Sequence, residues 1–134
     1  MYYEIDSDEV PQTLNISLVD KAICFTMDKL TFNDSIVTID FSEDFSEGQC
    51  GFADYDEDEY VVYLNPVLNF EQLVRTLFHE LVHIHQYMVG KLSHVGGQSV
   101  WYGQKYDCDY EDLPWEVEAF KLEEKLFEEF CLEN

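Results

Sequence analysis

The chain has 134 residues, of which 46% are hydrophobic and 16% aromatic, and its formal net charge is −22. This apolar content excludes a disordered acidic tail and suffices for one core, so we expect a single domain over residues 1–134. The charge disfavours direct binding to nucleic acid or to an anionic membrane, and it favours basic partners and divalent cations.

Two further features bear on the cellular compartment. No stretch approaches the roughly 20 consecutive apolar residues of a membrane span, and the start of the chain lacks the basic residues and the apolar run of a signal peptide. We therefore expect a cytoplasmic protein. The four cysteines, at positions 24, 50, 108 and 131, form no C-x-x-C pair. We expect mostly buried thiols rather than disulfides or thiolate metal ligands.

The N-terminal half of the sequence predicts one helix followed by three strands. Residues 1–12 are acidic, and we expect them to be loose. From Ser17 to Leu30, apolar residues recur at helical spacing behind a cap-type serine. Alternating and β-branched runs then predict three strands, the last two joined as a hairpin by the acidic turn 56–58. The expected strands cover residues 35–41, 49–55 and 59–65.

The C-terminal half predicts two helices separated by a long loop. Asn69 is the expected N-cap of the first helix, Gln72 completes a capping-box pattern, and Gly90 supplies the stop. A loop rich in glycine and aromatic residues over 90–112 leads to a final helix over 114–132. We therefore predict the α+β class, with an N-terminal helix, a small three-stranded antiparallel or mixed sheet, and two C-terminal helices.

The first of these two C-terminal helices contains the sequence His79-Glu80-Leu81-Val82-His83. Histidines four residues apart lie about 40° apart around a helix and one turn apart along it, so both imidazoles can bind one Zn²⁺. The glutamate between them then lies beside the open coordination position. We predict His79 and His83 as zinc ligands and Glu80 as the catalytic base.

The helical wheel places this motif opposite the apolar face of its helix. His79 and His83 therefore face a cleft in our prediction, rather than the packed interior. Gln86 lies on the same side and either lines that cleft or is a plain solvated amide. His85 lies about 160° around the helix from His83, on the apolar side, and we expect it in the core or in a layer supporting the site.

A catalytic zinc site requires a third protein ligand, and the downstream candidates are His94, the acidic cluster 107–112, Glu116 and Glu118. In the final helix Glu116 falls on the apolar face, whereas Glu118 falls on the polar face. A carboxylate on a buried face is costly unless a positive charge meets it, and zinc would meet it. We therefore choose Glu116 as the third ligand.

Glu123 also falls on the apolar face of the final helix. Two interpretations stay open for it. It accepts a hydrogen bond from a ligating imidazole, as carboxylates near zinc sites do, or it is a partly exposed glutamate at the helix edge. Ala119, one turn beyond Glu116, is small enough to let the two motif helices approach closely.

The two motifs, H-E-x-x-H from His79 and E-x-x-A from Glu116, resemble those of the gluzincin-type zinc metallopeptidases. The sequences His83-Ile-His-Gln and Leu113-Pro-Trp-Glu-Val-Glu-Ala are also similar to small metallopeptidase-like proteins of bacteria and phages, so a virus-encoded origin fits the chain. An aspartate is common after E-x-x-A in this family, but Phe120 stands here.

The resemblance covers residues 59–125 and implies a compact zincin-like domain whose edge strand, expected at 60–64, binds the substrate in extended form. It also implies hydrolysis of peptide bonds, in which Glu80 takes a proton from the zinc-activated water and later protonates the leaving amine. The candidates to stabilise the oxyanion come from the loop between the ligand helices. They are His94, Tyr106 and Tyr110.

The acidic charge favours a basic peptide or protein as substrate. Two alternatives remain to a peptidase. One is a zinc-stabilised acidic interaction module that binds a basic protein partner. The other is an acidic mimic of DNA, which accounts for the charge but gives no reason for two histidines and two glutamates in the spacing of a zinc site.

Overall fold

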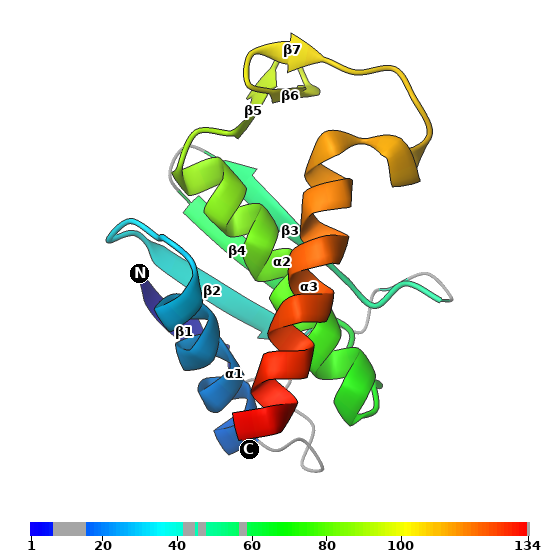
Figure 1. Cartoon of the computed structure of the whole chain (residues 1–134). Helices are drawn as coiled ribbons and strands as arrows, with labels where there is room; N and C mark the ends of the chain where they lie inside the picture. The colour runs from blue at the N-terminus through cyan, green and yellow to red at the C-terminus, as the bar shows by residue number, and fades with distance from the viewer. Residues whose placement is uncertain (7–15, 42–44, 46–47, 57–58, 134) are drawn as a thin grey trace.

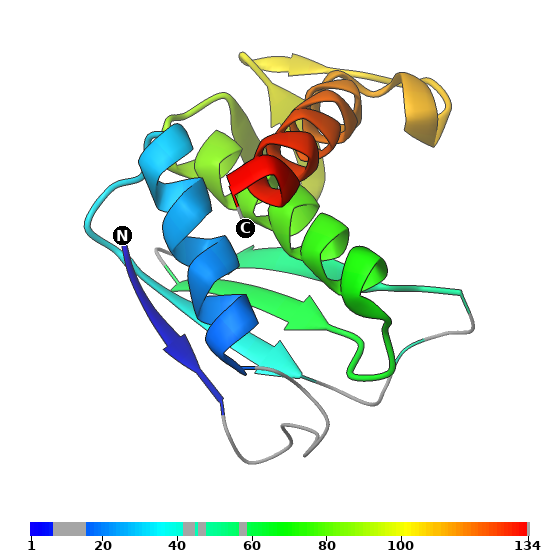
Figure 2. The same ribbon diagram turned by 60° about the horizontal axis from the view of Figure 1, so that its bottom comes forward.

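The computed structural model describes residues 1–6, 16–41, 45, 48–56 and 59–133. Within these ranges a four-stranded sheet is covered on one face by three helices (Figure 1). The helices are α1 (Ile16–Lys29), α2 (Phe70–Met88) and α3 (Pro114–Glu133), and the strands of this sheet are β1 (Tyr2–Ile5), β2 (Ile36–Phe41), β3 (Gly51–Asp56) and β4 (Glu59–Leu64). Figure 2 shows α1 and α2 against the sheet and α3 above α2. The α+β class is confirmed.

The main sheet is mixed, with the strand order β1-β2-β4-β3. Strands β1, β2 and β4 run parallel to one another, and β3 runs antiparallel to β4 at the edge of the sheet. All three predicted strands are present, and the hairpin is confirmed by the pairing of Asp56 with Glu59. Residues 57–58 of its predicted turn lie outside the described residues.

The expectation that residues 1–12 are loose is wrong for Tyr2–Ile5, which form β1. This strand lies beside β2, with Tyr2 opposite Ile36. The hydroxyl of Tyr3 also donates to Oδ1 of Asp20 in α1, at 3.1 Å. Pairing with a longer strand therefore orders a four-residue segment that has little signal of its own. Residues 7–12 of the predicted loose segment lie outside the described residues.

The core lies between the sheet and the helices. Buried and more exposed side chains alternate along β2 and β4, and the buried set points towards α1 and α2. Helix α2 is buried at every position from Leu77 to Gln86, because the sheet covers one side of it and α3 the other. Helix α3 thus covers much of the polar face of this helix, but His79 and His83 on that face still line a pocket, as the sequence predicted.

Both ends of α2 agree with the prediction. The side chain of Asn69 accepts from the backbone N–H of Gln72 at 2.9 Å, and the side chain of Gln72 accepts from the backbone N–H of Asn69 at 3.2 Å. The helix ends at Met88, and Gly90 follows with a φ of 83°, which is favourable for glycine. The capping box therefore fixes Phe70 as the first residue of the helix.

Residues 90–112 are not the plain loop that we predicted. They form a small antiparallel sheet of β5 (Leu92–Val95), β6 (Gln98–Trp101) and β7 (Gln104–Lys105), followed by the 3₁₀ turn η1 (Tyr110–Asp112). Each hairpin turns on two residues with positive φ, Gly96-Gly97 and Tyr102-Gly103. Two-residue turns of this kind are typical of tight hairpins. The two dipeptides were the sequence signal for this sheet.

No helix in the described part of the chain combines the length and the apolar character that a membrane span requires. The expectation of mostly buried thiols is wrong. Cys24, Cys108 and Cys131 are exposed and Cys50 is partly buried. Cys24 in α1 and Cys131 in α3 lie on the exposed sides of their helices. The core is built from aliphatic and aromatic side chains instead.

Candidate metal centre

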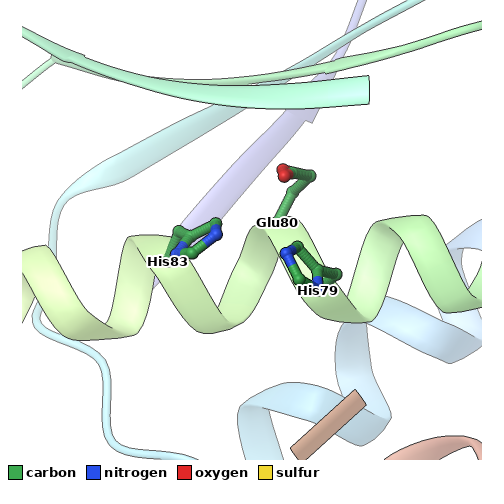
Figure 3. Close-up of side chains that lie close together, drawn as sticks. All are labelled: His79, Glu80 and His83. Atoms are coloured by element: carbon green, nitrogen blue, oxygen red, sulfur yellow. The ribbon is translucent and has the colours of Figure 1, made fainter. Parts of the chain in front are cut away.

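His79 and His83 project from consecutive turns of α2 with Glu80 rising between them (Figure 3). All three side chains are buried, with exposures of only 6–8%. One possible ligand atom of each lies within 4.8 Å of the others. The spacing of the motif therefore places two imidazoles and a carboxylate around one small volume, as the sequence predicted.

Glu116, in the first turn of α3, meets this group from the opposite helix. Its Oε1 atom lies 3.0 Å from Nε2 of His79 and 3.1 Å from Nε2 of His83. Ligand atoms bound at about 2.0–2.1 Å to a tetrahedral zinc ion lie about 3.3 Å from each other. Both separations from Oε1 of Glu116 are thus close to the distance that such an ion imposes between its ligands.

His79 is held from behind by a carboxylate. Its Nδ1 atom donates to Oε1 of Glu123 at 3.0 Å, and Oε2 of Glu123 lies 3.6 Å from the guanidinium of Arg75. Two interpretations were left open for Glu123, and the structure agrees with the first, in which its carboxylate accepts a hydrogen bond from the imidazole. The bond turns Nε2 of His79 towards Glu116.

His83 is held by an amide instead. Its Nδ1 atom lies 2.8 Å from Oε1 of Gln86, whose side chain is fully buried. Both predicted roles for Gln86, lining a cleft or standing in solvent, are wrong, because α3 covers this part of α2. The two imidazoles therefore both turn Nδ1 to a supporting side chain and Nε2 to Glu116.

This arrangement leaves more acceptors than donors around the two rings. A neutral imidazole carries one N–H, yet each ring has an oxygen acceptor at both nitrogens. With the proton on Nδ1, the lone pair of each Nε2 points at the carboxylate of Glu116. Only added protons or a metal cation at this point make the contact favourable, so the donor set fits a divalent cation.

The pKa values reflect the same competition. Burial lowers the pKa of His79, but hydrogen bonds with Glu116 and Glu123 outweigh it and raise the pKa to about 9. Burial also lowers the pKa of His83, but the hydrogen bonds with Glu116 and Gln86 and the charges of Glu80 and Glu116 together raise it. Burial raises the pKa of Glu116, but both imidazoles oppose it and lower the pKa to about 2. Without metal, His79 is therefore protonated on both nitrogens at neutral pH.

Glu80 is the least satisfied group of the site. Its Oε2 atom is buried and has no hydrogen-bond partner among the described residues. Burial raises the pKa of this carboxyl group, with the two histidines opposing the shift. An unpaired buried carboxylate is costly. The position next to two metal-ligand candidates fits a group that holds and releases a proton.

A pocket of about 700 Å³ opens beside these side chains. Residues 48–53, which include the first half of β3, line one wall, and α2 and α3 line the others. Leu92, Ser99 and Tyr110 contribute from the small sheet and from η1. Strand β3 and the segment that we had predicted to be a loop therefore both contribute to the walls of the pocket.

The three candidates for stabilising the oxyanion lie in different places. Tyr110 lines the pocket, and its pKa is raised by desolvation and by the charge of Glu116. Tyr106 lies against the ring of Trp115, and Nε2 of His94 lies 2.8 Å from the hydroxyl of Tyr87. Of the three proposed oxyanion donors, only Tyr110 lies among the residues that line the pocket.

The remaining ligand candidates lie elsewhere. Glu118 pairs with Nζ of Lys91 at 3.1 Å, and residues 107–112 are exposed. His85 is buried on the other side of α2, where its Nδ1–H donates to the carbonyl of Thr31. That placement confirms the prediction that His85 belongs to the core.

Sequence reasoning missed two side chains of this site. Gln86 supports His83, and its position one turn after the motif was the available signal. The ring of Phe120 lies against His79, with centroids 4.5 Å apart and the ring planes tilted by 58°. It thus fills with an apolar ring the place where a carboxylate was expected, and Glu123, three residues on, supplies the carboxylate.

Comparison with known proteins gives no further support, since no family model, no curated protein and no solved structure matches the chain. The function must therefore be inferred from the geometry of the chain itself.

Proposed function

We propose that this chain is a zinc-dependent metallopeptidase of the gluzincin type. The observation that carries the proposal is the convergence of Nε2 of His79, Nε2 of His83 and Oε1 of Glu116. Two imidazoles and one carboxylate are a common donor set for catalytic zinc, with one position left for water. The pocket beside the three atoms gives a substrate access to that position.

A zinc ion held by these ligands would act as a Lewis acid, lowering the pKa of a water molecule towards about 7 and polarising a carbonyl group. Glu80 is the general base of the proposal, because its buried carboxylate has a raised pKa and an unpaired oxygen beside the ligand atoms. It takes a proton from the attacking water and returns it to the leaving amine. Tyr110 donates its hydroxyl hydrogen to the oxygen that develops charge.

The substrate is proposed to lie along β3. The sequence predicted the strand at 60–64 as the edge strand, but β4 lies inside the sheet between β2 and β3. Among the described residues β3 is the edge strand beside β4, and its first half lines the pocket. An extended peptide can therefore add to this edge by main-chain hydrogen bonds.

The lining of the pocket supports a basic peptide as substrate. Its charged side chains include the carboxylates of Glu80, Glu116 and Glu123, and aromatic rings of Trp115 and Phe120 lie among them. Carboxylates attract cationic side chains, and aromatic faces bind them further. The net charge of −22 extends the same preference over the surface.

The test combines metal content with one substitution. We expect the purified chain to hold one equivalent of zinc by elemental analysis and to cleave a mixed library of peptides. Glu80→Gln should keep the zinc and lower the rate of cleavage by about 10²–10⁴-fold, as for loss of a general base. Glu124→Gln, on an exposed position of α3, is the matched control and should change neither.

Other outcomes select the alternatives. If zinc binds but no peptide is cleaved by the unaltered chain, the zinc-stabilised module that binds a basic partner replaces the peptidase. If the chain takes up no zinc, both readings fail, and the acidic mimic of DNA is the alternative left for the charge.

A further inference from the structure

Gln86 lies one turn after His83 in α2 and has no exposed surface. Burial of an amide is costly unless its polar atoms are paired. Here all of them are: Oε1 lies 2.8 Å from Nδ1 of His83, and Nε2 donates to the carbonyl of Trp115 at 3.0 Å and to Oε1 of Glu118 at 3.2 Å. A single side chain thus bridges the two helices that carry the ligand candidates.

The partners of Nε2 fix the orientation of this amide. Both of them are oxygens, and Nζ of Lys91 holds the carboxylate of Glu118 in place at 3.1 Å. A flipped amide would face two acceptors with its own oxygen. The oxygen of Gln86 must therefore face His83, which places the proton of that ring on Nδ1 and leaves Nε2 as the ligand atom.

The second bond of the amide acts on the other helix. Trp115 directly precedes Glu116, so the bond from Gln86 to the carbonyl of Trp115 holds the first turn of α3 against α2. Gln86 thus holds Nδ1 of His83 and the backbone next to Glu116, while Nε2 of His83 lies 3.1 Å from Oε1 of Glu116. Gln86 is in this way connected to two of the three ligand candidates.

We propose that Gln86 is a positioning residue of the zinc site: it sets the tautomer of His83 and the separation of His83 from Glu116. This inference rests on the proposed function only in requiring that the chain binds zinc. It does not require that the chain cleaves peptides.

The test measures metal binding in Gln86→Met, which keeps the volume of the side chain and removes its three hydrogen bonds. We expect the Kd for zinc, from competition with a chromophoric chelator, to rise about 10–100-fold, as for other residues that support metal ligands. The visible absorption of bound Co²⁺ should also change, since its bands report the geometry of the ligands. Loss of stability alone would not alter those bands in the folded protein.

Thr26→Val is the matched control. It also removes a fully buried hydrogen bond, from the hydroxyl of Thr26 to the carbonyl of Ala22 at 2.9 Å, but in α1. We expect this variant to lose stability while its zinc affinity and Co²⁺ spectrum stay unchanged. An equal effect of both substitutions on metal binding would overturn the proposal.

A measurement on the unaltered chain decides the matter even if Gln86→Met does not fold. In ¹⁵N spectra of the zinc-loaded protein, His83 should bind through Nε2 and carry a slowly exchanging proton on Nδ1. Ligation through Nδ1, or an Nδ1 proton that exchanges freely with water, would contradict the proposal. An unaltered chain that binds no zinc would overturn the proposed function as well, whereas normal zinc binding by Gln86→Met would overturn the role of Gln86 alone.

Discussion

His83 and Glu116 are 33 residues apart in the chain, yet Nε2 of the first lies 3.1 Å from Oε1 of the second. The fold brings them together by laying the first turn of α3 over the middle of α2. Neither side chain reaches water to any extent, with exposures of 8% and 6%. This contact between two buried groups is favourable only when a proton on His83 or a metal cation lies between Nε2 and the carboxylate.

The first prediction concerns the choice of third ligand. Glu116→Ala should weaken zinc binding by more than about 100-fold, beyond the effect typical of supporting residues, because it removes one of three protein ligands. Glu118→Ala is the matched variant two residues away, where the carboxylate pairs with Lys91 instead. It should leave zinc in place and raise the Kd by no more than about 10-fold, because Glu118 contacts the site only through its bond to Gln86. Elemental analysis after dialysis measures both, and equal retention by the two variants would refute the assignment.

The second prediction is that zinc binding releases protons. The pKa of His79 is raised to about 9 and that of His83 is also raised, whereas zinc binds the neutral imidazole. Between pH 6.5 and about 9 the metal must therefore displace a proton from His79, and the apparent affinity should rise about tenfold per pH unit for each proton released. Calorimetry in two buffers of different ionisation enthalpy measures the number. No release at pH 7 would contradict the charge state described above.

The metal-free chain should show the opposite dependence on pH. Because the folded pKa of His79 is raised, its stabilising contribution is complete below the unfolded value of 6.5 and is lost as the pH rises through about 9. The pKa of Glu116 is lowered, so its contribution is present above 4.5 and is lost as the pH falls through about 2. Urea midpoints with a chelator present should therefore fall above pH 7, and His79→Gln should flatten that slope.

Most of the secondary structure could be predicted because its signals are local. The apolar periodicity of α2, the capping box at Asn69 and the β-branched run of β2 each depend on residues close in sequence. β1 could not be predicted, since a strand of four residues is defined by its pairing with β2. The small sheet had a local signal in its two glycine-containing turns. The glycine-rich composition of residues 90–112 outweighed that signal and favoured a loop.

The residues of the site likewise divide into those that local sequence signals predict and those that depend on tertiary contacts. His79, Glu80 and His83 follow from a five-residue spacing, and the choice of Glu116 followed from finding a carboxylate on an apolar helix face. Gln86 could not be assigned, because its role depends on which helix covers the polar side of α2. The wheel of one helix shows which side is polar, but it cannot show that another helix buries that side.

The fourth prediction separates two tyrosines of the same segment. Tyr110 lines the pocket, and desolvation and the charge of Glu116 raise its pKa, so its hydroxyl stays protonated at neutral pH. Tyr110→Phe should lower kcat by about 100-fold, the effect of losing one donor to a developing oxyanion, without loss of zinc. Tyr106→Phe is the control, because Tyr106 is not among the residues that line the pocket, although its ring lies next to Trp115, which is. Steady-state kinetics on one peptide compare them, and equal rates for the two variants would exclude Tyr110 from the reaction.

The last prediction tests the close approach of β3 to α2. A Cβ atom at Gly51 would lie 2.6 Å from the carbonyl oxygen of Tyr63 and 2.9 Å from Cγ2 of Thr76. The backbone of β4 cannot yield as a flexible side chain can, so Gly51→Ala should push the edge strand away from the helix. We expect a loss of about 1–3 kcal/mol of stability, as for other overpacked sites, measured by urea unfolding.

The consequence for function distinguishes this strain from a general loss of stability. Because residues 48–53 line the pocket, displacement of β3 should raise KM for an extended peptide while zinc stays bound. Gly96→Ala is the control: its φ of 59° also makes a side chain costly, but nothing lies within 4 Å of the added Cβ. That variant should lose about 1–2 kcal/mol from the left-handed conformation and keep its KM. If Gly51→Ala kept its KM as well, the edge of β3 would not be the surface along which the peptide lies.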